Sequence, residues 1–354
     1  MTPDETSSAG RKTPLASLSP ESLSGALAAA GFPRYRAAQV FEWLYRKSAR
    51  AFSEMKNIGA SLREYLEGHF TPLSSTLFAV HDAGDGAAKL EISLGDGVRI
   101  ESVLIEAEKR LTLCVSSQAG CPLGCAFCAT GAGGFERNLL PHEIIEQALH
   151  AVSLAHGRRI SHVVFMGMGE PCLNLDAVFE AIRAFNAPHA FAIGARRITL
   201  STLGFPECIE RIAAFPLEVG LALSLHAADD ALRKRLCPNV RATVAETIRA
   251  ARDYFDRTGR EVTFEYVLLA GVNDSVAHAA ALASALTGSR AFVNLIPYNQ
   301  SRGLPFKRPS APKVVGFRRA LVARGVNVHV RDSRGAAAGA ACGQLRLERK
   351  AEIL

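Results

Sequence analysis

The sequence predicts an α/β fold in which six parallel β-strands, each followed by a helix, form an open, partial barrel. From Leu111 onward, short apolar runs alternate six times with stretches of helical spacing. Six such units are too few to close the usual eight-stranded barrel, so we expect an open one. Before Leu111 the patterns differ. They predict a small N-terminal helical module followed by a short antiparallel β extension.

The composition is that of an ordinary globular protein. Of the 354 residues, 48% are hydrophobic and 21% are charged, so a sizeable core is available. No apolar run approaches the roughly 20 residues of a membrane helix, and the polar N-terminus has no apolar secretory segment. Eight cysteines, three of them in one loop, are not a typical secreted disulfide framework, so we expect a cytoplasmic protein. The net charge of +7 favours a polyanionic partner only weakly.

The N-terminal region begins with a polar segment, residues 1–17, which we expect to be disordered. Residues 18–70 form the helical module, in which Ser19-Pro20-Glu21 signals a helix start and Arg36 begins a second helix that reaches Arg50. Basic and aromatic residues gather around this second helix: Arg34, Arg36, Arg46, Lys47 and Arg50 beside Tyr35 and Trp43. Such a face can bind RNA phosphates and stack on bases, but a solvated basic face explains it equally well.

The antiparallel extension occupies residues 71–110 and links the module to the barrel. Three strand-like segments, 76–81, 88–93 and 99–106, are separated by residues with hairpin chemistry. The barrel occupies residues 111–333, and a C-terminal tail occupies residues 334–354. The expected barrel strands are Leu111–Val115, His162–Met166, Arg197–Ser201, Glu218–Leu225, Glu261–Leu268 and Phe292–Pro297, with a further strand at Val326–Val330. The expected helices lie near 141–155, 175–185, 206–213, 244–255, 276–286 and 312–324.

The loop after the first barrel strand carries the most specific chemical signal. Cys121, Cys125 and Cys128 have the spacing C-x3-C-x2-C among several glycines. Structural zinc usually has four protein ligands, whereas three thiolates suit a 4Fe-4S cluster with one iron left open. An open iron can chelate the amino and carboxylate groups of S-adenosylmethionine. Zinc with a distant histidine and three unrelated buried cysteines are the alternatives.

Polar or glycine-rich residues follow four of the predicted barrel strands, at the edge where such folds bind ligands. They are Gly169 and Glu170, then Ser201, then Ser224, Leu225 and His226, and finally Asn299. Each alone could be a helix cap or a turn residue, and a lone histidine is more often structural. Beside the three-cysteine loop, the four strand ends together predict one ligand site.

The remaining cysteines fall into two groups. We interpret Cys172, Cys208 and Cys237 as small, semi-buried structural residues. Cys114 ends the first barrel strand, and Cys342 lies in the small-residue segment 340–345. Small residues allow a backbone to enter a narrow cavity, although an ordinary tail cysteine explains Cys342 equally well.

These segments together resemble the radical S-adenosylmethionine (radical SAM) RNA methyltransferases of the RlmN/Cfr family. The matches, in chain order, are SSQAGCPLGCAFCATG, FMGMGEP, STLGFPE, LALSLHA, FEYVLLAGVND, VNLIPYN, GLPFKRPS and AACGQL. The helical module also resembles the accessory RNA-binding domain of these enzymes. The resemblance implies a partial barrel of the radical SAM type with a 4Fe-4S cluster on the three loop cysteines. It further implies that S-adenosylmethionine contacts Gly169, Glu170, Ser201, Ser224, Leu225, His226 and Asn299.

The resemblance also implies a mechanism with two cysteines. One S-adenosylmethionine methylates Cys342, and a second is cleaved to a radical that takes hydrogen from the methylated cysteine, so two are used per turnover. The resulting carbon radical adds to an adenine ring. Cys114 then attacks the Cys342 sulfur and releases the methylated RNA as a transient disulfide forms. Glu101 matches the proton acceptor, a role also considered for Cys114.

Family members modify an adenosine at the peptidyl-transferase centre of 23S rRNA. The RlmN type acts at carbon 2 and also on the adenosine beside the anticodon of some tRNAs, whereas the Cfr type acts at carbon 8. We expect the RlmN type here, as a monomer without membrane contact that receives electrons from a donor such as flavodoxin or ferredoxin. The alternatives are the carbon-8 enzyme and an iron–sulfur RNA-binding protein without methyltransferase activity. Ala336–Gly339, Gln300 and Cys237-Pro238-Asn239 depart from the family pattern, which indicates a divergent member.

Overall fold

A computed structural model describes residues 12–331 and 333–346. Within these residues, ten strands form one sheet in the order β14-β13-β12-β11-β10-β9-β6-β5-β4-β3. Seven of them run parallel: β6 (Arg110–Cys114), β9 (His162–Phe165), β10 (Ile198–Thr202), β11 (Gly220–Ser224), β12 (Val262–Leu268), β13 (Ala291–Pro297) and β14 (Asn327–Val330). The expected strands are therefore all present, and β14 adds a seventh parallel strand. The sheet is open, as expected, with β14 and β3 at its edges.

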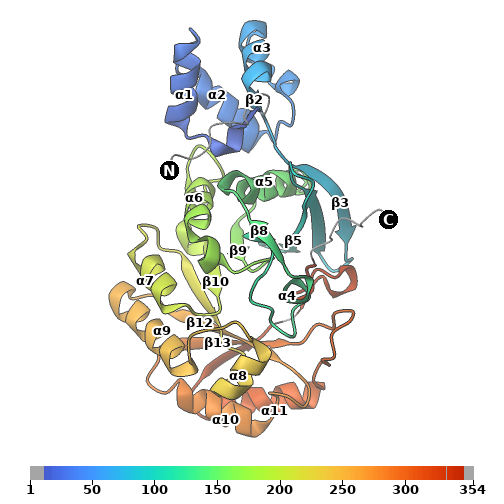
Figure 1. The fold of residues 1–354 in the computed structure, drawn as a ribbon, viewed down its shortest axis with the longest axis vertical. Coiled ribbons are helices and arrows are strands. Elements are labelled where there is room, and N and C mark those ends of the chain that lie inside the picture. The colour runs from blue at the N-terminus through green and yellow to red at the C-terminus, as the bar shows by residue number, and fades with distance from the viewer. Residues whose placement is uncertain (1–11, 332, 347–354) are drawn as a thin grey trace, which may run out of the picture.

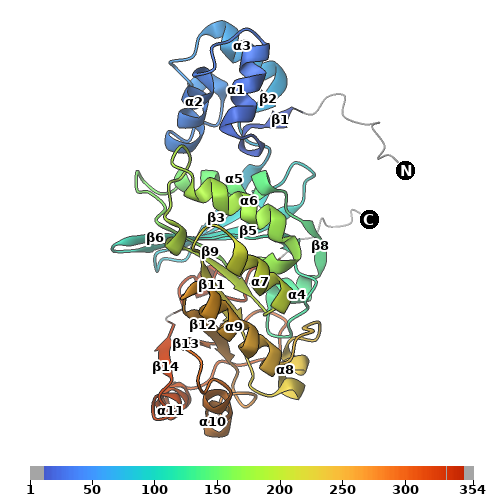
Figure 2. The same cartoon turned by 90° about the vertical axis from the view of Figure 1, so that its left-hand side faces the viewer.

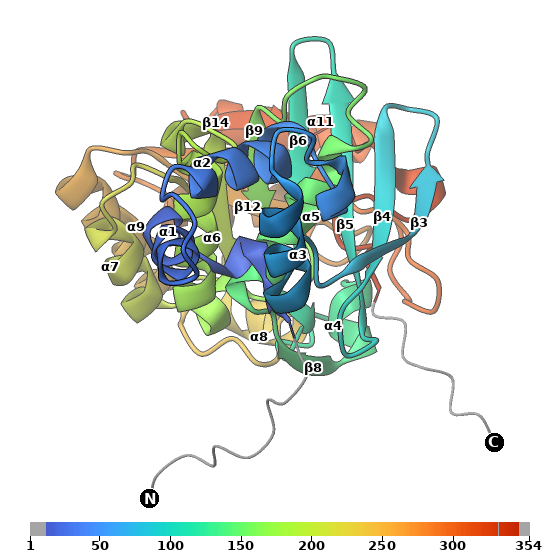
Figure 3. The same cartoon turned by 90° about the horizontal axis from the view of Figure 1, so that it is seen from above.

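The antiparallel extension continues the barrel sheet instead of forming a separate connector. It consists of β3 (Thr76–Asp82), β4 (Ala87–Ser93) and β5 (Arg99–Ala107), and β5 pairs antiparallel with β6. Figure 3 shows these strands side by side at one end of the molecule. Without them, the outer edge of β6 would present unpaired N–H and C=O groups. The extension therefore covers this edge of the barrel.

Six helices cover one face of the parallel strands. They are α5 (Pro141–Val152), α6 (Leu175–Asn186), α7 (Pro206–Ala214), α9 (Val244–Thr258), α10 (Val276–Ala285) and α11 (Ala311–Val322). They pack in pairs, α5 with α6, α7 with α9, and α10 with α11 (Figures 1 and 2). Local chemistry fixes the bounds of α9, where Thr243 Oγ1 accepts a hydrogen bond from the Glu246 N–H at 3.1 Å. Gly259, at φ +67°, ends the same helix.

Within the barrel region, four short helices and strands are not predicted by the sequence pattern. They are helices α4 (Ala129–Gly133) and α8 (Asp230–Leu236) and the hairpin strands β7 (Gln118–Gly120) and β8 (Phe135–Asn138). Elements this short show too few repeats for a periodicity. All but α8 lie within the cysteine loop or at its borders, so the loop is more ordered than its glycine content indicates.

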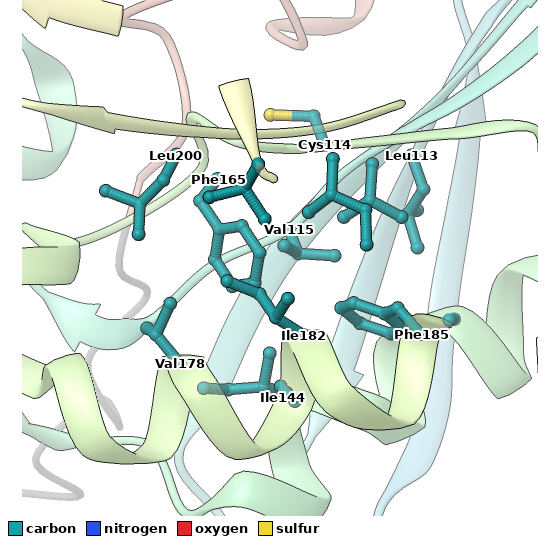
Figure 4. Close-up of a cluster of buried hydrophobic side chains, with 14 of the residues drawn as sticks. Leu113, Cys114, Val115, Ile144, Phe165, Val178, Ile182, Phe185 and Leu200 are labelled. Atoms are coloured by element: carbon teal, nitrogen blue, oxygen red, sulfur yellow. The ribbon is translucent and has the colours of Figure 1, made fainter. Parts of the chain in front are cut away.

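The two faces of the sheet differ in character, because the apolar core lies between one face and the helices. Figure 4 shows Leu113 and Val115 of the β6 region directed toward Ile182 and Phe185 of α6, whereas the Cys114 sulfur points to the opposite face. The alternation follows from strand geometry, in which successive side chains point to opposite faces. Because the helices occupy one face, Cys114 is directed toward the other, where the polar residues of the strand ends gather.

The N-terminal module lies at one end of the molecule, beyond α5 and α6 (Figures 1 and 2). It contains α1 (Pro20–Ala29), α2 (Arg36–Phe41), which continues as a π-helical turn (Glu42–Arg46), and α3 (Ala60–His69). The expected second helix therefore ends at Arg46, before Arg50. The strand β1 (Thr13–Pro14) pairs with β2 (Phe70–Thr71).

The expected disorder of residues 1–17 is wrong for residues 12–17. Leu15 is fully buried in the core of the module, and the short strand before it pairs with β2. A single buried leucine in a polar stretch gives no periodic signal, so the pattern could not reveal this anchor. The remainder of that expectation, residues 1–11, lies outside the described residues. In the part of the chain that is described, no helix is long and apolar enough to cross a membrane.

Candidate active site

A cavity lies at the carboxyl ends of the parallel strands. Ten of the residues singled out in the sequence line it: Cys121, Cys125, Cys128, Gly169, Glu170, Ser201, Ser224, His226, Asn299 and Cys342. Three other predicted residues, Cys114, Glu101 and Leu225, are not part of its wall. The strand ends, the cysteine loop and the tail therefore converge on one space.

The three loop cysteines are held by a compact backbone. The N–H of Cys128 donates to the carbonyl of Cys125 at 3.0 Å, and the N–H of Cys121 donates to the carbonyl of Gly134 at 2.8 Å. Gly131 must be a glycine, since a Cβ there would lie 2.8 Å from the Cys125 nitrogen. The loop is thus folded tightly enough to direct all three sulfurs to the cavity.

The donor set of this loop fits an iron–sulfur cluster better than a single zinc ion. The loop supplies three thiolates, whereas a structural zinc ion usually has four protein ligands. Burial, and next the neighbouring cysteines, raise the pKa of the Cys121 and Cys128 thiols. A bound cationic group would favour the thiolates and reverse this effect.

Gly169 and Glu170 lie in the loop that follows β9. A Cβ on Gly169, whose φ is +100°, would lie 2.6 Å from Gln118 Cβ, so only glycine fits. The Glu170 carboxylate accepts hydrogen bonds from the N–H of Cys172 at 3.0 Å and of Leu203 at 2.9 Å. Both of its oxygens therefore already accept backbone N–H groups, and the carboxylate ties the end of β9 to the end of β10 while lining the cavity.

His226 follows β11 in a strained backbone conformation, with φ +60°. Non-glycine residues rarely adopt this conformation, and when they do it is often at functional sites. Its Nδ1 accepts a hydrogen bond from the Val267 N–H at 3.2 Å. Burial, and next the charge of Arg233, lower the pKa of His226 to about 3. The ring is therefore neutral, with its proton on Nε2 available to a ligand, whereas the neighbouring Leu225 is fully buried outside the cavity wall.

The C-terminal tail is docked on the cysteine loop. The N–H of Ala129 donates to the carbonyl of Gly343 at 2.8 Å, and Thr130 Oγ1 donates to the carbonyl of Leu345 at 2.6 Å. Asn299 Nδ2 donates to the carbonyl of Cys342 at 3.4 Å. These contacts hold the tail so that Cys342, although exposed, lines the cavity.

Arg331 and Glu265 are cavity residues that the sequence reasoning missed. The Arg331 side chain is hydrogen-bonded to the Cys342 thiol, and its Nη1 donates to Met166 Sδ at 3.6 Å. Glu265 is 3% exposed, and its Oε1 accepts a hydrogen bond from Asn294 Nδ2 at 2.9 Å. Its Oε2 has no hydrogen-bond partner among the described residues. A signal existed for both, since Glu265 is a charge inside an apolar strand and Arg331 directly follows the last one.

Cys114 and Cys342 lie close enough to influence each other electrostatically, and both are near Arg331. Burial, and next the Cys342 sulfur, raise the pKa of Cys114 to about 12. Burial also raises the pKa of Cys342, while the Arg331 guanidinium opposes this rise. Cys114 thus remains a protonated thiol, whereas Cys342 has a cation that favours its thiolate.

Glu101 holds the tail from outside the cavity wall. Its carboxylate lies 2.7 Å from Lys89 Nζ and accepts a hydrogen bond from the Arg346 N–H at 2.7 Å. Burial raises the pKa of this carboxyl group, and the hydrogen bond from Lys89 opposes the rise. Glu101 lies on β5, one strand away from Cys114 in the sheet. Its present contacts are therefore structural ones to the tail.

The three cysteines that we interpret as structural have more defined partners than expected. Cys172 and Cys208 form a disulfide that links the segment after Glu170 to α7. Cys237 is fully buried in an apolar cluster against which Cys125 of the loop packs. Neither partnership has a signal in the local sequence, because both join residues that are distant in the chain.

The basic face of the N-terminal module serves in part to attach it to the barrel. Arg46 donates to the carbonyl of Pro188, and Arg50 Nη2 donates to Ser153 Oγ at 2.6 Å. Arg34 and Tyr35, in contrast, are exposed. The sequence pattern thus combines interface residues with residues that remain open to a partner.

Comparisons with known proteins cover both the module and the barrel. Residues 115–283 match the Radical SAM superfamily, and residues 13–71 match the ribosomal RNA large subunit methyltransferase N-terminal domain. A protein of Gloeobacter violaceus, named probable dual-specificity RNA methyltransferase RlmN, is 45% identical over 94% of this chain and 95% of its own length. A protein of the same name from Thermosynechococcus vestitus is 47% identical over 90% of this chain and 94% of its own length. The crystal structure of a radical SAM methyltransferase from Sphaerobacter thermophilus is 44% identical, with a TM-score of 0.92 over 94% of this chain and 99% of that one.

Proposed function

This chain belongs to the RlmN family of radical SAM RNA methyltransferases, and we propose that it methylates carbon 2 of an adenosine in 23S rRNA at the peptidyl-transferase centre. One observation carries the proposal: the docked tail brings Cys342 to the cavity that the three loop cysteines also line. An RNA-binding protein that holds an iron–sulfur cluster but has no methyltransferase activity needs no further cysteine, such as Cys342, at this cavity. The carbon-8 reaction uses the same groups, so regiochemistry is left to experiment.

As a radical SAM protein, the enzyme uses a 4Fe-4S cluster and S-adenosylmethionine. Cys121, Cys125 and Cys128 would hold the cluster, and the strand-end residues that line the cavity, together with Leu225, would hold S-adenosylmethionine. When bound, these groups supply the methyl group and the one-electron chemistry that an unactivated aromatic carbon requires. We propose two molecules of S-adenosylmethionine per turnover, one for the methyl group and one for hydrogen removal.

The chain's own residues prepare the methyl acceptor. Arg331 donates a hydrogen bond to Cys342 and favours its thiolate, the form in which a cysteine is nucleophilic. His226, with its proton on Nε2, is a donor for an oxygen or a ring nitrogen of the bound adenosine. Cys114 remains a thiol until its sulfur would bond to the Cys342 sulfur. The bond between the Cys342 sulfur and the methylene carbon would then break, and this carbon would take up a proton and leave as the methyl group of the RNA.

Two carboxylates are candidates for the proton acceptor. Glu101 is our proposal, because it occupies the matching position in the family. To act, it must first release Lys89 and the Arg346 N–H. Glu265 lines the cavity already, with one carboxylate oxygen lacking a partner among the described residues. Replacing each with glutamine separates them, since loss of the proton acceptor stops RNA methylation but leaves methylation of Cys342 intact.

Several partners belong to the same proposal. The relatives' names carry the term dual-specificity, and we infer a tRNA as the second substrate, at the adenosine beside the anticodon. The N-terminal module would contact RNA through its exposed residues, including Arg34 and Tyr35. A flavodoxin or ferredoxin would deliver the electrons, and the enzyme would act as a cytoplasmic monomer.

The decisive experiment pairs two cysteine variants with the native enzyme. Protein reconstituted anaerobically with iron and sulfide is incubated with reductant, S-adenosylmethionine and unmodified 23S rRNA, and the nucleosides are analysed by mass spectrometry. We expect 2-methyladenosine from the native enzyme, whereas 8-methyladenosine would reassign the reaction. Cys342→Ala should bind a full cluster yet produce no methylated RNA. Cys114→Ala should accumulate RNA covalently attached to the protein. Native-level methylation by Cys342→Ala would refute the proposal.

A further inference from the structure

The segment after α8 is fixed against the back of the cysteine loop. The N–H of Ala126 donates to the carbonyl of Leu236 at 2.8 Å, and Asn239 Nδ2 donates to the carbonyl of Pro122 at 2.9 Å. These two hydrogen bonds join parts of the chain that are distant in sequence. They hold Cys237, which directly follows Leu236, at a set position relative to the three loop cysteines.

The Cys237 side chain is fully buried at this contact, in an apolar cluster against which Cys125 packs. Cys237 is not among the residues that line the cavity. Apolar residues of both segments surround it: Leu123, Phe127, Leu232, Leu236 and Val240. Water is therefore excluded from around the Cys237 sulfur, and a hydrogen bond that this sulfur donates in such surroundings is stronger than in water.

A buried cation lies beside the same pair of sulfurs. Arg233 of α8 is 1% exposed, and its Nη1 donates to the carbonyl of Ala242 at 2.7 Å and to Thr247 Oγ1 at 3.0 Å. Its Nε has no hydrogen-bond partner among the described residues, and its charge acts on both Cys125 and Cys237. The charge of Arg233 thus favours negative charge on the Cys125 side of the loop.

We propose that Cys237 donates a hydrogen bond to the Cys125 sulfur and thereby raises the reduction potential of the cluster that Cys121, Cys125 and Cys128 hold. Once Cys125 binds iron its sulfur has no proton, so Cys237 is the partner that can donate. Reduction adds one electron from the external donor to the cluster and increases the negative charge on its sulfurs. A hydrogen bond to a ligand sulfur stabilises that reduced state, because such bonds are among the factors that set cluster potentials.

Cys237 would thus be a tuning residue that acts through Cys125, and the inference rests on the cluster of the proposed function. Packing alone is the competing explanation for its burial. Valine is apolar and of similar size but has no donor, whereas serine retains a donor of similar shape. The matched variants are therefore Cys237→Val and Cys237→Ser.

The test is a redox titration of the reconstituted cluster, followed by electron paramagnetic resonance. We expect Cys237→Val to shift the midpoint potential to a more negative value, and Cys237→Ser to lie nearer to the native protein. Equal potentials for Cys237→Val and the native protein, at equal iron and sulfide content, would overturn the inference. Cys237→Ala replaces the valine variant if that one fails to bind a cluster, with the same expected direction.

The contact itself is tested on the native protein without its cluster. Mild oxidation with diamide removes two electrons and two protons from a pair of adjacent thiols, and peptide mapping identifies the disulfide formed. We expect a Cys125–Cys237 link, with Cys172–Cys208 as the internal reference. Detection of the reference without the link would overturn the contact. A native protein that never assembles a cluster would instead contradict the proposed function, and this inference with it.

Discussion

The cavity at the strand ends and the N-terminal module differ in how their polar residues are used. At the cavity, polar side chains from the ends of six strands, β9 to β14, face the same space as the cysteine loop and the tail. In the module, Arg46 and Arg50 of the basic face instead bond to Pro188 and Ser153 of the barrel. Polar residues at neighbouring strand ends are therefore good evidence of a shared ligand site. A cluster of charge along one helix is weaker evidence, because it does not distinguish a binding face from an internal interface.

The largest expected effect within the cavity comes from Arg331→Met. Loss of a charged hydrogen bond to a thiolate costs about 1.5–3 kcal/mol, so alkylation of Cys342 by iodoacetamide should slow by about 10- to 100-fold at pH 8. In the native protein the rate should rise with pH through the alkaline range, because burial raises the pKa of Cys342 and only the thiolate reacts. Arg331→Lys is the control and should retain part of the rate. An unchanged alkylation rate in Arg331→Met would show that Arg331 does not favour the Cys342 thiolate.

At the module the largest effect should come from Glu146→Ala. The buried Glu146 carboxylate of α5 accepts the N–H groups of Ser74 and Ser75, at 2.8 and 2.9 Å, where the module joins the sheet. Removing it leaves several buried donors unsatisfied, which should lower the free energy of unfolding by about 2–4 kcal/mol. Urea unfolding measures the loss. Binding of S-adenosylmethionine should be unaffected, and weakened binding would show that module and cavity are coupled.

A pH effect should appear at the same junction. Burial, and next Arg50, lower the pKa of His150 to about 4, so the folded state binds its proton more weakly than the unfolded state. Between about pH 6.5 and pH 4 the unfolded state therefore binds more protons, and stability should fall as the pH falls through this window. Urea midpoints measured at pH 7 and pH 5 give the change. His150→Gln should reduce the difference, and an equal decline in that variant would assign it to other groups.

The smallest effect should come from Arg34→Ala on the exposed part of the module. Loss of one phosphate contact should weaken RNA binding a few-fold and reduce the slope of log K against log salt by about 1. Arg46→Ala is the matched comparison, since its guanidinium bonds to the barrel. We expect Arg46→Ala to lower stability with little change in the salt slope. The reverse pattern would show that the module presents a different face to RNA.

The fold and most of the cavity residues could be predicted from the sequence, because the patterns that indicate them are local. Apolar runs predicted the barrel strands, and the spacing of Cys121, Cys125 and Cys128 indicated the loop chemistry. Long-range partners had no such signal. Docking of the tail through Thr130 and Leu345, and the contact between Cys237 and Cys125, join segments that no local pattern relates. The helices and strands around the loop were missed because they are shorter than a periodicity can detect.

The most direct measurement of the convergence at the cavity is a peptide map of the native, cluster-free protein after brief, mild oxidation. If Cys114 and Cys342 meet at the cavity, digestion should yield a peptide pair joined through these two residues. The pair should be absent from Cys342→Ala. Recovery of Cys114 and Cys342 as separately alkylated peptides, while Cys172–Cys208 is found intact, would contradict a shared site and with it the two-cysteine mechanism.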